Sequence, residues 1–228
     1  PKIPPGDVAL ILYGDVPLVQ PATLKKLVTK AAKGQVAVLT AEMANPTGYG
    51  RILRGERGAV IAIVEEKDAT PQQRQLSEIN TGLIACPAGK LVKWIARLKP
   101  NNAQKEYYLT DVIGLAVKDG VAVAAVAAES EDEVLGINDK AQLAAAEKIL
   151  RRRLAGELMA AGVTLVDPDR IDIRGELVCG RDVLIEPNVI FEGVVHIGDG
   201  ARIGAVAQIR GTRRGAGSVA QRQRRHED

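Results

Sequence analysis

Short apolar segments alternate with amphipathic segments along the first 139 residues of the chain. The apolar segments are rich in Val and Ile and are bounded by Gly, Pro or charged residues, which is typical of β-strands. In the amphipathic segments the apolar residues recur at helical spacing. The pattern predicts strands at 8–13, 36–40, 60–64, 79–85 and 121–127, and helices at 21–32, 91–98 and 107–117. This alternation predicts an α/β domain with a doubly wound sheet.

The segment from Val8 to Tyr13 is a nearly continuous apolar run that stops at Gly14 and Asp15. Such a run is expected of a parallel strand that is buried on both faces of its sheet. Ligands of open α/β sheets bind beyond the carboxyl ends of the strands, where a carboxylate can hold a hard cation such as Mg²⁺. Asp15 is therefore a candidate metal ligand, and Gly-Asp after a strand is also an ordinary turn sequence.

Residues 140–161 are rich in Ala, Leu, Glu, Lys and Arg, with Gly156 as the one helix-weakening residue. This composition predicts a long helix that begins after Asp139, a suitable N-cap residue. The helix either links two domains or is the last helix of the α/β domain.

Beyond this helix, apolar residues recur every six positions in two columns over residues 162–209. The first column contains Leu165, Ile171, Leu177, Val183, Val189, Val195, Ala201 and Ala207, and the second contains Ile173, Cys179, Ile185, Phe191, Ile197, Ile203 and Ile209. A six-residue period predicts a parallel β-helix in which each repeat forms a short strand and a turn, with both columns pointing inward. Gly180, Gly198 and Gly204 fall at predicted turn positions, where a bare backbone helps.

The columns end after Ile209, because the next members would be Arg213 and Gly215. Six Arg and two acidic residues lie between Arg210 and Asp228, whereas the whole chain has a net charge of +3, so the rest is nearly neutral. We interpret residues 210–228 as an aberrant basic tail, either a solvated terminus or, as we favour, the product of a changed reading frame. A nucleic-acid partner would depend on this tail alone and is not expected.

The composition favours a folded cytoplasmic protein. With 46% hydrophobic residues among 228, the chain can bury a sizeable core. No apolar run approaches the ~18 residues of a membrane span, and no leader sequence is recognisable, so we expect no membrane association. Cys86 and Cys179 lack metal-type spacing, and we expect buried free thiols.

Several polar groups suited to a sugar ligand follow or open predicted strands. Pro46 to Arg51 is a glycine-bearing turn that would let a planar or sugar ligand approach the backbone, and it also has the composition of an ordinary tight turn. Glu65 ends one strand and Asn80 opens the next, so a carboxylate and a carboxamide would face one crevice. These groups hydrogen-bond sugar hydroxyls and an acetamido group. Asn138, just before the long helix, could instead be a helix-start residue.

The motifs occur in a fixed order, at residues 12–18, 46–51, 64–70, 78–82, 102–111 and 136–138, followed by the hexads. In this order they closely resemble the bacterial bifunctional N-acetylglucosamine-1-phosphate uridyltransferase/glucosamine-1-phosphate acetyltransferase family, from Val8 to about Gln208. The resemblance implies a truncated Rossmann-like nucleotide-diphospho-sugar transferase (uridyltransferase) domain at 1–139 and a linker helix at 140–161. It also implies that residues 162–209 begin a left-handed parallel β-helix, the acetyltransferase domain.

The family resemblance implies a Mg²⁺-dependent enzyme that forms UDP-N-acetylglucosamine and pyrophosphate from UTP and N-acetylglucosamine 1-phosphate. A second activity acetylates glucosamine 1-phosphate with acetyl-CoA in a homotrimer, and the product supplies peptidoglycan and lipopolysaccharide synthesis. Carried over by motif, Asp15 and Asn138 would hold Mg²⁺. The implied nucleotide-sugar contacts are Tyr13, Gly14, Asp15, Gly50, Glu65, Asn80 and Asn138, with Tyr108 and Thr110 as second-tier contacts to sugar or phosphate.

The chain departs from the family pattern at both ends. It starts at Pro1, without the family's glycine-rich loop whose Arg and nearby Lys grip the triphosphate, and it stops before the acetyl-transfer His. His196 lies between the inward-facing Val195 and Ile197, should point to solvent, and cannot replace that His. We therefore expect neither activity at a useful rate from this polypeptide alone.

Two other readings share part of this pattern. A glucose-1-phosphate nucleotidyltransferase with another base or sugar would also have the Gly-Asp strand end and appended hexads, but Asn80 to Gly82 and Tyr107 to Asp111 favour the N-acetylglucosamine enzyme. A non-catalytic assembly subunit would use a degenerate nucleotidyltransferase fold. Degeneration is opposed by the retention of Asp15, Glu65, Asn80 and Asn138, whereas the missing phosphate loop is compatible with it.

Overall fold

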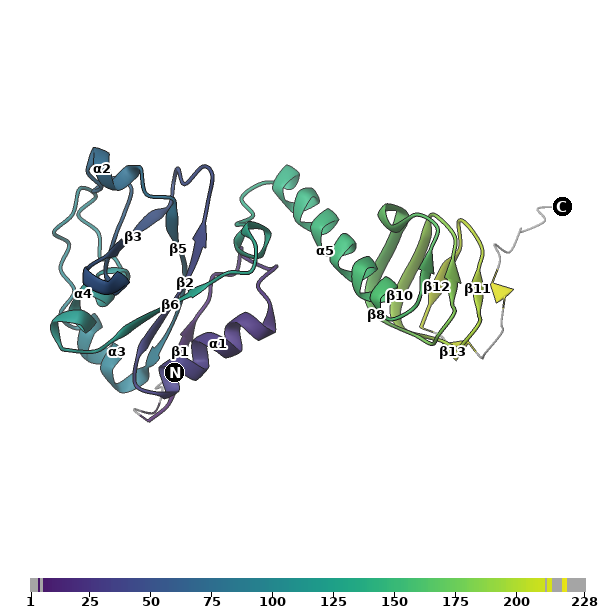
Figure 1. The fold of residues 1–228 in the computed structure, drawn as a ribbon, viewed down its shortest axis with the longest axis horizontal. Helices are drawn as coiled ribbons and strands as arrows, with labels where there is room; N and C mark the ends of the chain where they lie inside the picture. The colour runs from purple at the N-terminus through teal and green to yellow at the C-terminus, as the bar shows by residue number, and fades with distance from the viewer. Residues whose placement is uncertain (1–3, 5, 212, 215–218, 221–228) are drawn as a thin grey trace. The chain divides into compact units, whose positions relative to one another are not determined.

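A computed structural model describes residues 4, 6–211, 213–214 and 219–220 of the chain. The chain divides into two compact units, Pro1–Asn138 and Asp139–Asp228, which are taken in turn below (Figure 1). Within the described part, no helix combines the length and apolar character that crossing a membrane requires.

The first unit is built on a mixed six-stranded sheet. Its strand order is β4-β3-β5-β2-β6, and β1 also pairs with β5. β2 and β6 are parallel, whereas β5 runs antiparallel to β1, β2 and β3, and β3 is antiparallel to β4. The strands are β1 (Val8–Ile11), β2 (Val36–Glu42), β3 (Gly50–Arg54), β4 (Val60–Val64), β5 (Glu78–Pro87) and β6 (Val123–Ala127).

Helices cover both faces of this sheet, as the predicted alternation implies. They are α1 (Pro21–Ala32), α2 (Pro71–Arg74), α3 (Ala88–Ile95) and α4 (Asp111–Lys118), with 3₁₀ turns η1 (Glu56–Gly58) and η2 (Glu131–Val134). The sheet has an apolar core on each face, and alternate residues of β2 belong to different cores, because successive side chains of a strand point to opposite faces. Val36 and Val38 pack with α3 and α4, whereas Ala37 and Leu39 pack with α1.

The prediction that residues 8–13 form a parallel strand buried on both faces is wrong. β1 pairs antiparallel with β5, and within it only Ala9 is buried. An antiparallel strand needs one face in the core, so a continuous apolar run does not by itself specify burial on both sides. The helix expected at 107–117 begins later, at Asp111. β3 and α2 lie in segments for which the sequence pattern predicted no strand or helix.

The second unit begins with α5 (Lys140–Ala160), which confirms the predicted long helix. The Asp139 side chain caps it by accepting a hydrogen bond of 2.7 Å from the Gln142 N–H. Ala155 and Leu158 of α5 join the apolar core of the strands that follow. The helix therefore belongs to the packing of the second unit.

Two parallel sheets make up the rest of this unit. One contains β8 (Ile171–Cys179), β10 (Val189–Ile197), β12 (Gln208–Arg210) and β13 (Arg213–Arg214); the other contains β7 (Thr164–Leu165), β9 (Leu184–Ile185), β11 (Arg202–Ile203) and β14 (Val219–Ala220), and a 3₁₀ turn η3 (Pro168–Arg170) precedes β8. Ile171 pairs with Val189, and Leu184 with Arg202, so that partners lie three hexads apart. β13 and β14 fall in the segment interpreted as a basic tail, of which 212, 215–218 and 221–228 lie outside the described residues.

Both apolar columns point into the core of this unit, as predicted. Most members are buried, and Ile173, Leu177 and Cys179 are half-buried against them. His196 is partly exposed between two buried neighbours, as expected. A Cβ on Gly180 would lie 2.7 Å from the backbone N of Asp199, so the close approach of these two segments requires glycine there.

The two cysteines are free, as the sequence predicts. Cys86 is buried and Cys179 is half-buried, so the expected burial holds fully for the first alone. Burial raises the pKa of both thiols to about 11, because the thiolate is poorly solvated. Neither thiol therefore has the lowered pKa of a reactive cysteine.

Truncation of Phe191 should destabilise the second unit selectively. Phe191 is 1% exposed in its core, whereas Val194 on the same strand is 54% exposed and serves as the control. We expect Phe191→Ala to lower the opening free energy of β8 and β10 by about 3–5 kcal/mol, and Val194→Ala by less than about 1 kcal/mol. Hydrogen exchange followed by mass spectrometry would measure both; equal protection in the two variants would contradict the packing described.

Candidate functional site

A cavity of about 450 Å³ lies at one end of the first unit's sheet, where segments distant in sequence meet. Its lining comprises Tyr13, Asp15, Val16, Thr47, Gly48, Tyr49, Gly50, Glu65, Asn80, Thr81, Gly82, Val134, Gly136 and Asn138. Every residue predicted to contact the ligand is present except Gly14. Tyr108 and Thr110, the second-tier candidates, lie outside this lining.

The metal-ligand candidates Asp15 and Asn138 come together across Gly136. A Cβ on Gly136 would lie 3.7 Å from Asp15 Oδ2 and 3.9 Å from Asn138 Nδ2. The Ile137 N–H also donates a 2.8 Å hydrogen bond to the carbonyl oxygen of Asp15, which ties the two backbone segments directly. One carboxylate and one carboxamide therefore approach a common point.

This pair of oxygen-bearing side chains fits a hard cation that is shared with a ligand. Mg²⁺ usually takes one or two protein ligands and completes its shell with water and phosphate oxygens. Among the described residues there is no cluster of three or more His, Cys, Asp or Glu that could form an all-protein cage. Two oxygen-bearing side chains therefore suit an ion that takes its remaining ligands from water and phosphate.

Glu133 stabilises this arrangement, and the sequence analysis did not identify it as a residue of the site. Its side chain is 1% exposed, and its two oxygens accept hydrogen bonds from the Gln20 N–H at 2.8 Å and the Glu129 N–H at 3.1 Å. A buried carboxylate is tolerated when such donors satisfy it. Its neighbour Val134 reaches the cavity, so Glu133 anchors the segment that carries Asn138. The sequence signal that could have indicated its burial is the position of an acidic residue directly before the apolar Val134 and Leu135.

Glu65 is held by Thr110 from outside the cavity. The Thr110 hydroxyl donates a 2.8 Å hydrogen bond to Glu65 Oε1. On the other side, a Cβ on Gly50 would lie 3.2 Å from Glu65 Oε2 and 3.1 Å from Ile63 Cγ2, so glycine leaves room for the carboxylate. Thr110 is thus a positioning residue for Glu65. The Tyr108 hydroxyl instead donates to Gln104 Oε1 at 2.8 Å.

Asn80 is oriented by its own strand. Its Oδ1 accepts a 3.1 Å hydrogen bond from the Gly82 N–H, and the residue is 7% exposed. This orientation leaves the amide NH₂ as the donor that the side chain can offer to a ligand. Next to it, Gly82 has φ +83°, and the ring of Tyr13 occupies the space that a Cβ of Gly82 would need.

The loop that contains Thr47 to Gly50 is fastened by two charged residues that the sequence analysis did not single out. Glu66 accepts a hydrogen bond from the Gly48 N–H, and buried Arg51 donates to the Tyr49 carbonyl oxygen. Arg51 also donates to the Arg74 carbonyl oxygen at 3.3 Å, and its guanidinium lies 3.7 Å from the Glu66 carboxylate. The glycine-bearing turn is therefore a braced wall of the cavity.

Comparison with known proteins gives consistent sequence relatives. The chain is 52% identical over 218 residues to the bifunctional protein GlmU of Azoarcus sp., 53% identical over 218 residues to that of Aromatoleum aromaticum, and 51% identical over 218 residues to that of Cupriavidus taiwanensis. Each match covers 96% of this chain and 48% of the relative. The chain thus spans about half the length of these relatives. The resemblance to the bifunctional family is confirmed.

Other comparisons add little. No protein-family model matches the chain. Among solved structures, a putative glucose-1-phosphate thymidylyltransferase from Bacillus anthracis in complex with a sucrose aligns with a TM-score of 0.43 and 19% identity, over 62% of this chain and 55% of that one. A likeness at this level supports no conclusion about function.

Substitution of Gly82 should disturb the cavity through Tyr13. In Gly82→Ala the new Cβ would lie 2.0 Å from Tyr13 Cε2, and Ala at positive φ adds about 1–2 kcal/mol of backbone strain. Gly136→Ala is the control, because its Cβ meets Asp15 Oδ2 at an ordinary 3.7 Å. In urea unfolding, we expect Gly82→Ala to lose stability and Tyr13→Ala to restore part of the loss. Purely additive effects in this double-mutant cycle would refute the clash.

Proposed function

We propose that the chain is part of a bifunctional protein of the GlmU kind, and that its first unit binds the nucleotide sugar of a uridyltransferase. The reaction would form UDP-N-acetylglucosamine and pyrophosphate from UTP and N-acetylglucosamine 1-phosphate. The observation that carries this proposal is the convergence of Asp15, Glu65, Asn80 and Asn138 on one cavity. The 50–53% identity to GlmU proteins supports the same activity.

Glu65 and Asn80 would recognise the sugar. The carboxylate of Glu65, oriented by Thr110, can accept hydrogen bonds from sugar hydroxyls. The NH₂ group of Asn80 can donate to the carbonyl oxygen of an acetamido group, since its own oxygen is already bonded to Gly82. Gly50 and Gly82 would let the ligand approach the backbone, and Tyr13 would form one wall.

Asp15 and Asn138 would hold Mg²⁺ together with phosphate oxygens of the ligand. Bound there, the ion would neutralise charge on the uridylyl group as it passes from UTP to the sugar phosphate with release of pyrophosphate. Nucleotidyl transfer of this kind, in which the sugar phosphate attacks the α-phosphorus of UTP and pyrophosphate leaves, depends chiefly on alignment and electrostatics and needs little covalent participation by the protein. The role of this chain's residues is therefore to position the sugar and its phosphate. The buried Glu133 and the Ile137-to-Asp15 hydrogen bond keep the two ligand segments together.

For the second unit, we propose the opening coils of a left-handed parallel β-helix. Parallel pairing at three-hexad intervals and two inward apolar columns support this assignment. In the whole protein, this region would belong to a cytoplasmic homotrimer that acetylates glucosamine 1-phosphate with acetyl-CoA. The product would supply peptidoglycan and lipopolysaccharide synthesis.

Loss of the Asp15 charge should remove the metal dependence of ligand binding. We expect Mg²⁺ to tighten binding of UDP-N-acetylglucosamine by the 228-residue chain. Asp15→Asn should reduce this enhancement about tenfold or more, which corresponds to a loss of about 1.4 kcal/mol of binding free energy. Asp132→Asn is the control, because Asp132 is exposed in the turn η2 that precedes the segment with Asn138. Isothermal titration calorimetry with and without Mg²⁺ measures the ratio. An unchanged ratio in Asp15→Asn, or no binding at all, would overturn the assignment.

Asn80→Asp should weaken recognition of the acetamido group in particular. Aspartate keeps the acceptor for the Gly82 N–H and loses the NH₂ donor. We expect the preference for UDP-N-acetylglucosamine over UDP-glucose to fall about 10- to 100-fold, corresponding to one unsatisfied buried polar group. UDP-glucose is the matched ligand, because the added charge acts on both diphosphates alike. Affinities reduced equally for both ligands would rule out this role for Asn80.

A further inference from the structure

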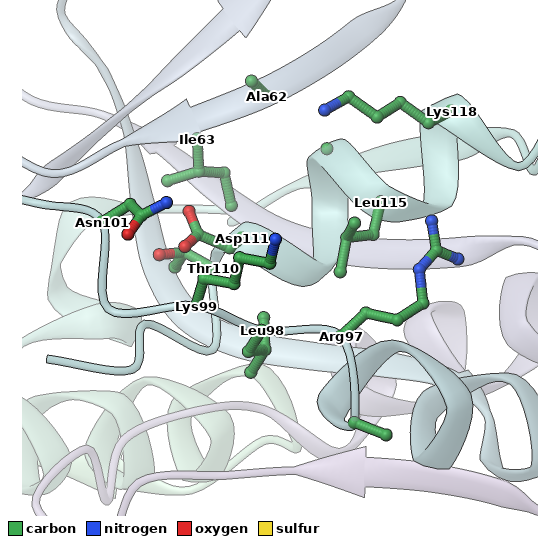
Figure 2. A pocket seen from close by; sticks show the side chains of 12 residues that line it. Ala62, Ile63, Arg97, Leu98, Lys99, Asn101, Thr110, Asp111, Leu115 and Lys118 are labelled. Carbon is green, nitrogen blue, oxygen red and sulfur yellow. The ribbon is translucent and has the colours of Figure 1, made fainter.

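A second cavity, of about 730 Å³, lies on the first unit between β4, α4 and the segment that follows α3 (Figure 2). Its apolar wall includes Ile63, Leu98 and Leu115. Gly114 lies in the same wall, and a Cβ there would meet nothing within 4 Å, so the helix leaves open space at this point. The cavity is within the size range of small-molecule sites.

The charges around this cavity favour an anion. Arg97, Lys99 and Lys118 line it, against the single carboxylate of Asp111. Figure 2 shows Lys99 and Lys118 extending from opposite sides, Lys99 from the segment after α3 and Lys118 from α4. In the described part of the chain, no ion pair is recorded for either lysine, whereas Arg97 pairs with Asp119 at 2.6 Å.

The Asp111 carboxylate does not neutralise these lysines. Its pKa is raised, first because neighbouring atoms desolvate the carboxylate and then because Asp68 repels the ionised form. A close ammonium group would instead lower that pKa. Among the described residues neither Lys99 nor Lys118 forms an ion pair, so both ammonium groups are open to an anionic ligand.

We infer that this cavity binds a small organic anion that carries an apolar group, such as an alkyl phosphate. The anionic end would lie with Lys99 and Lys118, and the apolar part against Ile63, Leu98 and Leu115. This site is separate from the nucleotide-sugar cavity, although the two are neighbours. Thr110 lines the second cavity and donates its hydrogen bond to Glu65, which lines the first.

The fold contains its own reporter for this site. Trp94, the one tryptophan of the chain, donates a 2.8 Å hydrogen bond from Nε1 to Asp119 Oδ2. The same oxygen accepts from Arg97 Nη1 at 2.6 Å. Arg97 lines the same cavity, so an anion held there by Lys99 and Lys118 would change the electrostatic field at the indole, and Trp94 fluorescence would record its binding.

Hexyl phosphate is a suitable probe for the test. We expect it to change Trp94 emission saturably, with at least tenfold weaker binding of 1-hexanol and of inorganic phosphate, each of which carries one half of the recognition. Binding should persist when UDP-N-acetylglucosamine is saturating. Equal affinities for hexyl phosphate and inorganic phosphate, or displacement of the probe by the nucleotide sugar, would overturn the inference.

Substitutions in the cavity lining test whether the probe binds in this cavity. Gly114→Leu should fill the open space and weaken the binding of hexyl phosphate at least tenfold. Gly114→Ala, with its small side chain, should change this affinity less than about threefold. Both Leu and Ala have a higher helix propensity than Gly, so neither substitution should destabilise α4. The double substitution of Lys99 and Lys118 by Met should also weaken hexyl phosphate at least tenfold. Calorimetric affinities that are unchanged in Gly114→Leu would refute the site. Loss of hexyl phosphate binding alone would leave the uridyltransferase proposal intact, because that cavity is lined by other residues.

Discussion

The candidate site depends on the attachment of the loop that precedes α5 to the loop that follows β1. Two hydrogen bonds contribute to this attachment: the buried carboxylate of Glu133 accepts from the Gln20 N–H, and the Ile137 N–H donates to the Asp15 carbonyl oxygen. A buried carboxylate with a hydrogen bond to each oxygen is costly to lose, because its partners would be left unsatisfied. Without this attachment, nothing in the covalent chain would bring Asp15 near Asn138.

The cavity side chains are held in position by hydrogen bonds and ion pairs to their neighbours. Thr110 holds Glu65, the Gly82 N–H holds Asn80, and Glu66 and Arg51 brace the loop around Gly48. Such support reduces the entropy that a ligand would otherwise lose in ordering these groups. Glycines at the points of closest approach complete the arrangement, since larger residues would displace Tyr13 or Glu65.

The two units are stabilised in different ways. The first depends on contacts between segments distant in sequence, because β5 pairs with β1, β2 and β3 and helices pack on both faces. The second repeats one local unit: β8 pairs with β10, β10 with β12 and β9 with β11 at intervals of three hexads, and the apolar columns stack on themselves. In such a repeat, stability is close to a sum over neighbouring coils. Loss of one core residue should therefore act mainly on adjacent coils.

The sequence by itself determined the elements whose signal is local. The hexad columns and the helix after Asp139 follow from side-chain periodicity and capping, and both were predicted correctly. The ordered motifs likewise identified most of the residues that line the candidate cavity. The antiparallel pairing of β1, the buried role of Glu133 and the Thr110-to-Glu65 hydrogen bond were decided only by the tertiary structure. Their partners lie far away along the chain, and neither hydrophobic period nor residue type specifies which distant strand or backbone N–H a side chain will meet.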